Sequence, residues 1–348
     1  MTKLPQILHL VDDATPGGVT RVLEHIRTCP MMADAGEHIV QTVSPRGRLP
    51  HCNADMIVSH LSMNWRRLPA LITFRARHAG TPLVHVEHSY TEAFTILNVK
   101  SKLRFFTMLR TAYALFDTVV AVSAEQGAWL KRRRLVSEQT LRVIAPVVPL
   151  DQFRALKAPT GKPRVIGAIG RLHRQKGFDV LLQAFRSLPD RDIALHVYGV
   201  GPEEEALREI ANGDPRICFY GYCDRPEIVM NAIDVVAMPS RWEAFGLVAL
   251  EARAAGRGLV CTDMDGLSMS GGDDARFVRG HNIRDWTKVL QETLAQDVNA
   301  VAPDRVAGCE AAFAENWQGL IEHHLPQQSV RIRKTKNGAA GLAVVSAN

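Results

Sequence analysis

Between residues 239 and 256 the chain reads Pro239-Ser-Arg-Trp-Glu-Ala-Phe-Gly-Leu-Val-Ala-Leu-Glu-Ala-Arg-Ala-Ala-Gly256. Glu243 lies in a loop that contains glycine, and Glu251 follows inside an amphipathic helical pattern. A helix that begins near residues 245–246 places both carboxylates by its N-terminus, where free N–H groups and the helix dipole favour a phosphate or a polyol. Carboxylates also accept hydrogen bonds from adjacent hydroxyls of a sugar or ribose. The alternative is a solvated helix face that carries two acids.

The composition is that of a soluble globular protein with about two domains. The chain has 348 residues, of which 46% are hydrophobic, and its net charge of +6 suits an anionic partner. None of the six cysteines has zinc or redox spacing. The N-terminus leads directly into a strand-like run without a signal peptide, and no apolar run approaches the roughly 20 residues that cross a bilayer. We therefore expect a cytoplasmic protein with free thiols.

Short β-branched runs alternate with helical patterns, which predicts parallel sheets with helices on both faces. The pattern starts at residues 7–11 and starts again at 164–170, after the turn-rich segment 160–163. We predict an α/β fold of two doubly wound, Rossmann-like domains that face each other across a cleft, with ligands beyond the carboxyl ends of the strands. The predicted units are an N-terminal domain (1–155), a C-terminal domain (160–302), a helix returning toward the first domain (303–326) and a disordered tail (331–348).

A glycine-rich loop follows the first strand of each series. In the second half it reads Gly170-Arg-Leu-His-Arg-Gln-Lys-Gly177, where Arg171 can grip a phosphate through its planar guanidinium and Lys176 can supply a compact charge. In the first half it reads Asp13-Ala-Thr-Pro-Gly-Gly-Val19, whose glycines let the backbone approach a ligand closely. Neither loop has the Walker or dinucleotide pattern, which argues against a nicotinamide enzyme. The plainer interpretation is that both basic residues are solvated.

His85-Val-Glu-His88 ends another predicted strand. His88 would lie at the carboxyl end and face the cleft, whereas His85 would lie within the strand. A single histidine is more often packed or surface-exposed than catalytic, so position alone favours His88.

Together these pieces resemble the retaining family 4 glycosyltransferases, also called glycosyl transferases group 1, which use nucleotide-diphosphate sugars and have the GT-B fold. The resemblance covers about residues 164–266 and is looser in the first half. It rests in the second half on Gly170-Arg-Leu, Lys176-Gly177, Val197-Tyr-Gly-Val-Gly-Pro202, Phe219-Tyr-Gly221, Ala237-Met-Pro-Ser240, Glu243-x7-Glu251 and Thr262-Asp-Met-Asp-Gly266, and in the first half on Pro16-Gly-Gly-Val19, His88 and Asp117-Thr-Val-Val-Ala-Val-Ser123.

This resemblance implies a role for each candidate residue. Arg171 and Lys176 would bind the donor diphosphate, Glu251 the ribose hydroxyls and Glu243 the transferred sugar, while His88 would approach that sugar near the acceptor. The other predicted substrate-binding residues are Gly17, Gly18, Gly170, Ala244, Phe245, Gly246 and Leu247. Fixed cations and helix-end donors would stabilise the departing diphosphate without a metal.

Two Asp-x-Asp sequences fit the manganese pattern of the other large glycosyltransferase fold, Asp190-Arg-Asp192 and Asp263-Met-Asp265. Acids at this spacing are common by chance in surface loops. We therefore predict no metal and no cofactor, with the nucleotide-diphosphate sugar as co-substrate.

The chain departs from the family pattern in three places. Ala145-Pro-Val-Val-Pro149 replaces an Asn-Gly turn, and Leu267-Ser-Met-Ser-Gly-Gly-Asp-Asp274 replaces a segment rich in glycine and proline. The N-terminal domain is also short, which leaves the acceptor site open.

A basic amphipathic stretch at residues 99–116, followed by Lys131-Arg-Arg-Arg134, could lie in an anionic membrane interface. The alternative is a core helix with a solvated basic face. If a membrane is contacted, the acceptor could be a lipid-linked saccharide.

We predict a retaining glycosyltransferase that transfers a sugar to a saccharide or lipid-linked acceptor during synthesis of a polysaccharide or cell-envelope glycan, such as an exopolysaccharide or lipopolysaccharide. It would act in the cytoplasm, or at the inner face of the cytoplasmic membrane, without nucleic acid. The alternatives are a catalytically degenerate nucleotide-sugar-binding or scaffold subunit and a nucleotide-sugar epimerase. A phosphorylase would need a cofactor lysine, for which the sequence gives no signal.

Overall fold

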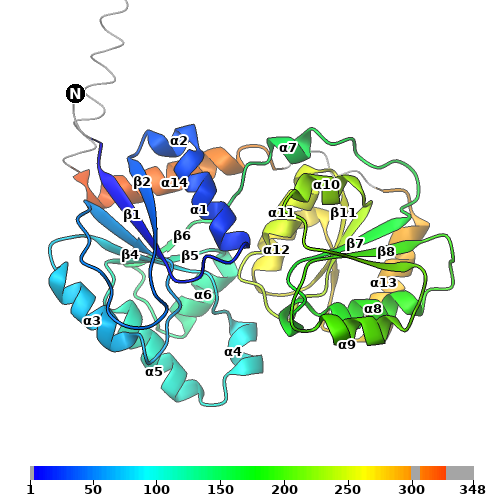
Figure 1. The fold of residues 1–348 in the computed structure, drawn as a ribbon, viewed down its shortest axis with the longest axis horizontal. Helices are drawn as coiled ribbons and strands as arrows, with labels where there is room; N and C mark the ends of the chain where they lie inside the picture. Colours follow the sequence, from blue (N-terminus) through cyan, green and yellow to red (C-terminus); the bar gives the residue numbers. More distant parts are fainter. Residues whose placement is uncertain (1–3, 299–305, 327–348) are drawn as a thin grey trace, which may run out of the picture.

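The computed structural model describes residues 4–298 and 306–326 and contains a parallel sheet in each half of the chain. Figure 1 shows the two sheets side by side with helices packed around them. The predicted fold class, α/β with two doubly wound domains, is confirmed. The tail predicted for residues 331–348 and the end of the predicted second domain lie outside the described residues.

The first sheet has six strands in the order β2-β1-β3-β4-β5-β6. Its order reverses between β1 and β3, so that the loops after these strands open into one crevice. The strands are β1 (Gln6–Val11), β2 (Glu37–Thr42), β3 (Met56–Ser59), β4 (Leu83–Glu87), β5 (Thr118–Ala121) and β6 (Leu141–Val143).

The second sheet also has six strands, in the order β12-β11-β10-β7-β8-β9, and reverses between β7 and β10. The strands are β7 (Val165–Ile169), β8 (Ala194–Tyr198), β9 (Ile217–Gly221), β10 (Val235–Met238), β11 (Gly258–Thr262) and β12 (Arg276–Val278). Every residue of β10 and of β5 is buried, because helices cover both faces of each sheet and the strands are continuous apolar runs.

Helices and single turns fill the connections between strands. Around the first sheet these are α1 (Gly18–Thr28), α2 (Pro30–Ala33), α3 (Leu68–Arg77), α4 (Glu92–Asn98), α5 (Lys102–Tyr113) and α6 (Ala124–Arg132). Helix α7 (Asp151–Arg154) lies between the domains. Around the second sheet are η1 (Arg174–Lys176), α8 (Phe178–Arg186), α9 (Glu204–Ala211), α10 (Pro226–Asn231), α11 (Leu247–Ala254), α12 (Asp265–Gly271), η2 (Gly272–Asp274) and α13 (Ile283–Ala295).

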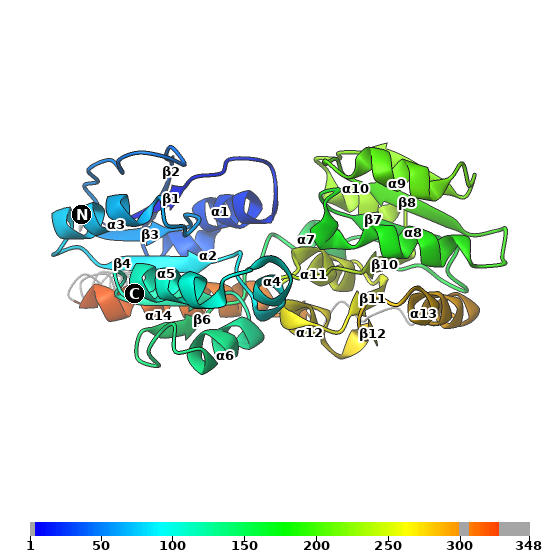
Figure 2. The ribbon, with the colours of Figure 1, turned by 90° about the horizontal axis from the view of Figure 1, so that it is seen from below.

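The last described helix, α14 (Cys309–His324), packs against the N-terminal domain. The amide of Gln318 donates to the Met31 carbonyl at 2.8 Å, and Thr118 Oγ1 lies 2.9 Å from His324 Nε2. Figure 2 shows α14 running beneath the first sheet. The chain therefore crosses back from the second domain and covers one face of the first.

Side chains also join the two domains beside the cleft. The ring of Phe94, on α4, meets the Trp242 ring edge-on at 5.9 Å, and Arg174 donates to Asn98 Oδ1 at 3.4 Å. One apolar cluster contains buried residues of both sheets together with α14. These contacts hold the facing loops of the two domains close to each other.

The apolar side of the basic stretch at residues 99–116 is largely used for packing. On α5, Met108, Leu109, Ala112 and Tyr113 are buried in the core of the first domain, whereas Leu103 is 82% exposed. The structure therefore agrees with a core helix that has a solvated basic face. No helix within the described residues is long and apolar enough to span a membrane.

Candidate functional site

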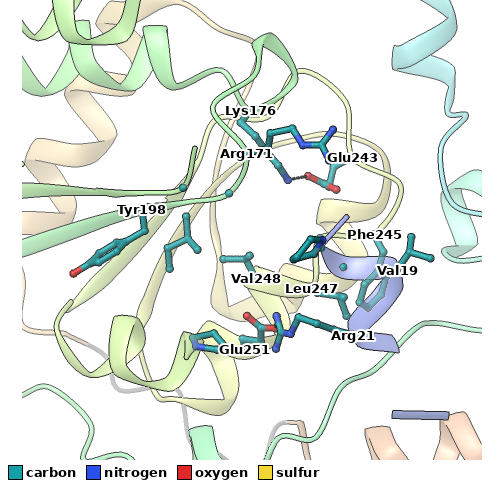
Figure 3. A pocket seen from close by; sticks show the side chains of 18 of the residues that line it. Val19, Arg21, Arg171, Lys176, Tyr198, Glu243, Phe245, Leu247, Val248 and Glu251 are labelled. Carbon is teal, nitrogen blue, oxygen red and sulfur yellow. Dashed lines mark hydrogen bonds and ion pairs between the residues drawn. The ribbon is translucent and has the colours of Figure 1, made fainter. Parts of the chain in front are cut away.

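A cavity of about 730 Å³ lies between the domains, at the carboxyl ends of β1, β4, β7, β8, β9 and β10. Its walls come from the loops that follow these strands and from the first turns of α1 and α11 (Figure 3). All the predicted catalytic and substrate-binding residues line it: Gly17, Gly18, His88, Gly170, Arg171, Lys176, Glu243, Ala244, Phe245, Gly246, Leu247 and Glu251. The structure thus brings together the residues that the sequence analysis placed in one site. The roles of these residues stay predictions.

Lys176 and Glu243 form an ion pair at one side of the cavity, with Lys176 Nζ donating to Glu243 Oε2 at 2.5 Å. Gly177 makes this contact possible. It has φ of 66°, and a Cβ there would lie 2.0 Å from the Pro239 carbonyl oxygen, so only glycine lets the basic loop pack against the end of β10. The loop after β7 thereby places Lys176 next to Glu243, which lies in the loop after β10.

Glu251 lies on α11, is 1% exposed, and pairs with Arg21 of the other domain. Arg21 Nη1 is 2.5 Å from Glu251 Oε1 (Figure 3). Burial raises the pKa of Glu251, and the guanidinium of Arg21 offsets part of that rise. The carboxylate predicted to hold ribose therefore already has a cationic partner across the cleft.

The N-terminus of α11 faces the same space. Gly246 caps it with φ of 94°, and no side chain accepts from its first N–H groups. The Phe245 carbonyl is held by Ser270, whose hydroxyl donates to it at 2.6 Å. This end therefore keeps free N–H donors and a positive dipole for a polyol or an anion. The helix begins one residue after the predicted range of 245–246.

Arg171 is exposed in the loop after β7 and forms no ion pair within the described residues. Hydrogen bonds from Thr15 lower the pKa of Asp13, and the charge of Arg171 lowers it further. The arginine therefore stands near the glycine-rich loop of the facing domain, and its guanidinium is available for a ligand.

His88 follows β4 and is partly buried at the cavity wall. Its Nε2 lies 2.8 Å from Nδ1 of His60, which is buried. Burial lowers the pKa of His88 to about 4, so its ring is neutral at physiological pH. The opposite wall contains Tyr198, together with the exposed Tyr222 after β9.

Arg21, His60 and Tyr222 were missed by the sequence analysis. Arg21 gives a weak signal, since it is a cation in the first turn of a helix that follows a glycine pair. Its partner Glu251 lies on the other domain, which no local pattern identifies. His60 depends on the neighbouring strand for its contact, and Tyr222 stands outside the matched motifs.

Within the described residues no group of three His, Cys, Asp or Glu side chains could hold a metal ion. Neither Asp-x-Asp sequence lines the cavity. Asp190 accepts from the Asp192 amide at 2.9 Å in a local turn, and Asp263 lies 3.8 Å from Arg279. The absence of a metal in the reaction stays a prediction.

Both halves of the chain match models of known protein families. Residues 14–152 match the model described as Glycosyltransferase Family 4, and residues 163–296 match Glycosyl transferases group 1. The chain belongs to the group 1, family 4 glycosyltransferases. The two matches meet near the domain boundary, and the second contains the basic loop and both glutamates.

Family 4 relatives with curated names include two D-inositol 3-phosphate glycosyltransferases. One, from Corynebacterium jeikeium, is 36% identical over 211 residues, which are 52% of this chain and 50% of the relative. Another, from an Arthrobacter species, is 32% identical over 273 residues, or 71% of this chain and 63% of the relative. The chain spans about half the length of the curated relatives it matches first.

Solved structures show the same fold at low sequence identity. Sucrose-phosphate synthase from Thermosynechococcus elongatus has a TM-score of 0.67 at 20% identity, covering 96% of this chain and 100% of that one. An Anabaena protein solved in complex with UDP has a TM-score of 0.63 at 17% identity, with 96% and 100% coverage. The glycosyltransferase fold of this chain, GT-B, is therefore confirmed.

Proposed function

We propose that this protein is a retaining glycosyltransferase that moves a sugar from a nucleotide-diphosphate sugar to a saccharide or lipid-linked acceptor. One observation carries the proposal: a single cavity holds Arg171, Lys176, the free end of α11 and the carboxylates of Glu243 and Glu251. This combination matches the parts of such a donor, because cations and N–H groups suit the diphosphate and carboxylates suit the hydroxyls of ribose and sugar.

In the proposed reaction the bond between the anomeric carbon and the diphosphate oxygen breaks. The acceptor oxygen bonds to the same carbon, and the acceptor proton passes to the departing diphosphate. Negative charge grows on the leaving group, where the cations of Arg171 and Lys176 line the cavity and would stabilise that charge without a metal. His88 would contact the sugar near the acceptor.

Donor binding would exchange partners at both ion pairs. Lys176 would turn from Glu243 to a phosphate oxygen, and Glu243 would accept from a sugar hydroxyl. Glu251 would accept from ribose while remaining near Arg21. Because the cavity already holds balanced charges, binding would replace existing interactions and would leave no charge buried alone.

The names of similar proteins support a nucleotide donor and a glycan product. One structural neighbour is described in complex with UDP, and another as a glycosyltransferase involved in lipopolysaccharide biosynthesis. We therefore place the reaction in polysaccharide or cell-envelope glycan synthesis, in the cytoplasm, with neither metal nor cofactor.

Release of nucleoside diphosphate from a panel of nucleotide-diphosphate sugars tests this function. Lys176→Ala and Glu243→Ala should each lower kcat about 100-fold or more, as loss of one fixed charge-stabilising group does elsewhere. Lys288→Ala, an exposed lysine on α13, is the matched control and should leave the rate unchanged. Unaltered turnover in the first two variants would refute the site assignment.

Product analysis separates the alternatives. Nucleotide binding without release would indicate a degenerate binding subunit, and conversion of the sugar while it stays attached to the nucleotide would indicate an epimerase. Transfer of labelled sugar to an acceptor supports the proposal.

We also propose a peripheral contact with the inner face of the cytoplasmic membrane through the tip formed by α4 and α5. This tip exposes Ile96 (60%), Leu97 (43%) and Leu103 (82%), and Arg104 lies over the Trp65 ring at 5.7 Å. Exposed apolar residues beside cations suit an anionic lipid interface. Wild-type protein should sediment with phosphatidylglycerol vesicles at low salt, and Leu103→Ser should weaken this. Equal recovery with neutral vesicles would contradict it.

A further inference from the structure

A buried carboxylate lies directly beside His88 in the chain. Glu87 is the last residue of β4, is 3% exposed, and accepts hydrogen bonds at both of its oxygens. Its Oε1 accepts from the backbone N–H groups of Ser89 at 2.7 Å and Tyr90 at 3.0 Å. Its Oε2 accepts from the hydroxyl of Tyr113, on α5, at 2.6 Å. One oxygen therefore holds the turn that follows β4, and the other is anchored to a helix in the core.

The carboxylate has no lysine or arginine partner. Within the described part of the chain no such cation pairs with Glu87, and His85 Nε2 lies 3.4 Å from Oε2. Burial raises the pKa of Glu87, but His85, the Tyr113 hydroxyl and the Ser89 amide outweigh burial and hold that pKa below its usual value. An ionised acceptor forms stronger hydrogen bonds than a neutral one. Glu87 therefore holds the turn as a carboxylate near pH 7.

Stability alone is a poor explanation for a charge at this position. Taking a carboxylate out of water costs several kcal/mol, which its hydrogen bonds at best offset. An apolar side chain of similar volume would fill the same space without that cost. What the carboxylate of Glu87 adds is a fixed geometry for two consecutive backbone N–H groups.

The turn after β4 is also held on its other side. The hydroxyl of Tyr90 donates to the Met63 carbonyl at 2.6 Å, and the side-chain amide of Gln126 donates to the Tyr90 carbonyl at 2.9 Å. The ring of His88 is held separately, with its Nε2 at 2.8 Å from His60 Nδ1. The backbone that carries His88 is thus fixed by neighbours of the turn, and its ring by the adjacent strand.

We propose that Glu87 is a positioning residue, whose Oε1 keeps the turn after β4 in one conformation so that His88 stays in place at the cavity wall during sugar transfer. Glu87 does not line the cavity, so it acts through His88 and not on a ligand. Ser89 is exposed and Tyr90 half-buried. Without Oε1 their N–H groups would bond to water, and the turn would no longer be held. The effect on transfer rests on the proposed glycosyltransferase function, whereas the hold on the turn does not.

Amide hydrogen exchange tests the hold on the turn without any substrate. In the wild type, the amides of Ser89 and Tyr90 should exchange about tenfold or more slowly than unprotected amides, the value of one hydrogen bond. Glu87→Met should abolish this protection. Glu87→Gln should restore it, because the amide oxygen of glutamine can take the place of Oε1. Wild-type amides that exchange as fast as unprotected ones overturn the proposal.

Kinetics then test the effect on His88. Glu87→Met should lower kcat for sugar transfer about tenfold or more, because misplacement of a group at the reacting sugar by about 1 Å has such effects. The KM for the donor should stay constant, since none of the predicted donor contacts is altered. Glu87→Gln should bring kcat back to within about threefold of the wild type. A wild-type kcat in Glu87→Met, in spite of fast exchange at Ser89 and Tyr90, overturns the positioning role.

A matched control separates positioning from stability. Asp117 is a partly buried carboxylate that accepts from the Leu83 N–H at 2.8 Å, at the opposite end of β4, and pairs with Arg75. Asp117→Leu should lower the unfolding temperature as Glu87→Met does, but should leave kcat unchanged wherever both variants are folded. An equal fall in kcat in the two variants overturns the proposal.

If Glu87→Met does not fold, Tyr113→Phe keeps the test decisive. It removes only a partner of Oε2, so the amides of Ser89 and Tyr90 should stay protected and kcat should stay near that of the wild type. A fall in kcat with both amides still protected overturns the proposal. If the wild type turns over no donor at all, the proposed function fails, and the exchange measurement alone decides whether Glu87 holds the turn.

Discussion

At the scale of single residues, the ion pair between Arg21 and Glu251 links the two domains and affects the stability of the folded protein. Glu251 is almost fully buried, whereas a third of the Arg21 side chain is exposed. Removing the arginine leaves a buried carboxylate without the cation that pairs with it. The free energy of folding lost in this way is larger than the net stabilisation that the intact pair provides. The pair therefore matters to stability even if the arginine never touches a ligand.

We expect Arg21→Met to destabilise the protein by about 1–3 kcal/mol at pH 7 in urea unfolding, because Glu251 loses the cation that pairs with it. The loss should shrink as the pH falls from 7, because the raised pKa of Glu251 lets its carboxyl take up a proton at a higher pH than usual. Arg27→Met removes an exposed pair with Glu24 on the same helix and should change stability by about 0.5 kcal/mol or less. Equal effects of both variants would contradict the argument.

The residues of the site differ in whether a local sequence pattern is enough to predict them. Arg171, Lys176, Glu243 and Glu251 were predicted as one site from the resemblance to family 4. They meet in the structure because strand ends in a parallel sheet share one edge. Arg21 could not be assigned its partner, because that contact depends on how two domains face each other. The contacts that join His88, His60, His9 and His38 ring to ring need the strand order β2-β1-β3-β4, which sequence periodicity does not contain.

At the scale of elements, the longer strands and the basic loop (170–177) were predicted from the sequence, whereas the shortest strands and the contact that positions the loop were not. Strands β6 and β12, with three residues each, were not predicted because so short a run has no measurable period, whereas the longer strands and α8 follow their patterns. The loop between β7 and α8 was recognised from its glycines and basic residues. Its close approach to Pro239 was not, since that contact comes from the neighbouring strand β10.

Gly177→Ala should displace this loop. A Cβ would collide with the Pro239 carbonyl oxygen at 2.0 Å, in addition to the strain of φ at 66°, so Lys176 should move away from Glu243. We expect nucleoside diphosphate release to fall about tenfold or more, because an angstrom-scale shift of a charge-stabilising group has such effects. Gly213→Ala is the matched control: it has φ of 67° but nothing within 4 Å, so it should cost only about 1 kcal/mol in thermal unfolding and leave release unchanged. Similar rates for the two variants would show that the close approach is unimportant.

At the scale of the whole molecule, the buried histidines link stability to pH. The pKa of His9, His38, His60 and His88 is lower in the folded protein than the usual value of 6.5, and about 4 for His38 and His88. Between those values the unfolded chain binds more protons than the folded one, so stability decreases as pH falls. The stabilisation is complete above pH 6.5 and is lost progressively down to about pH 4. Glu251 acts with the opposite sign, because its pKa is raised.

Urea unfolding at pH 7.5, 6 and 5 should therefore show a steep loss of stability, reaching several kcal/mol, since each unit of lowered pKa is worth about 1.4 kcal/mol. His38→Phe removes one of these four titrating rings and should flatten this dependence, even if the variant is less stable at pH 7.5. His51→Phe, an exposed histidine of the same domain, should reproduce the wild-type slope. If the slopes of the wild type and His38→Phe coincide, the ring of His38 is not held neutral by burial in solution.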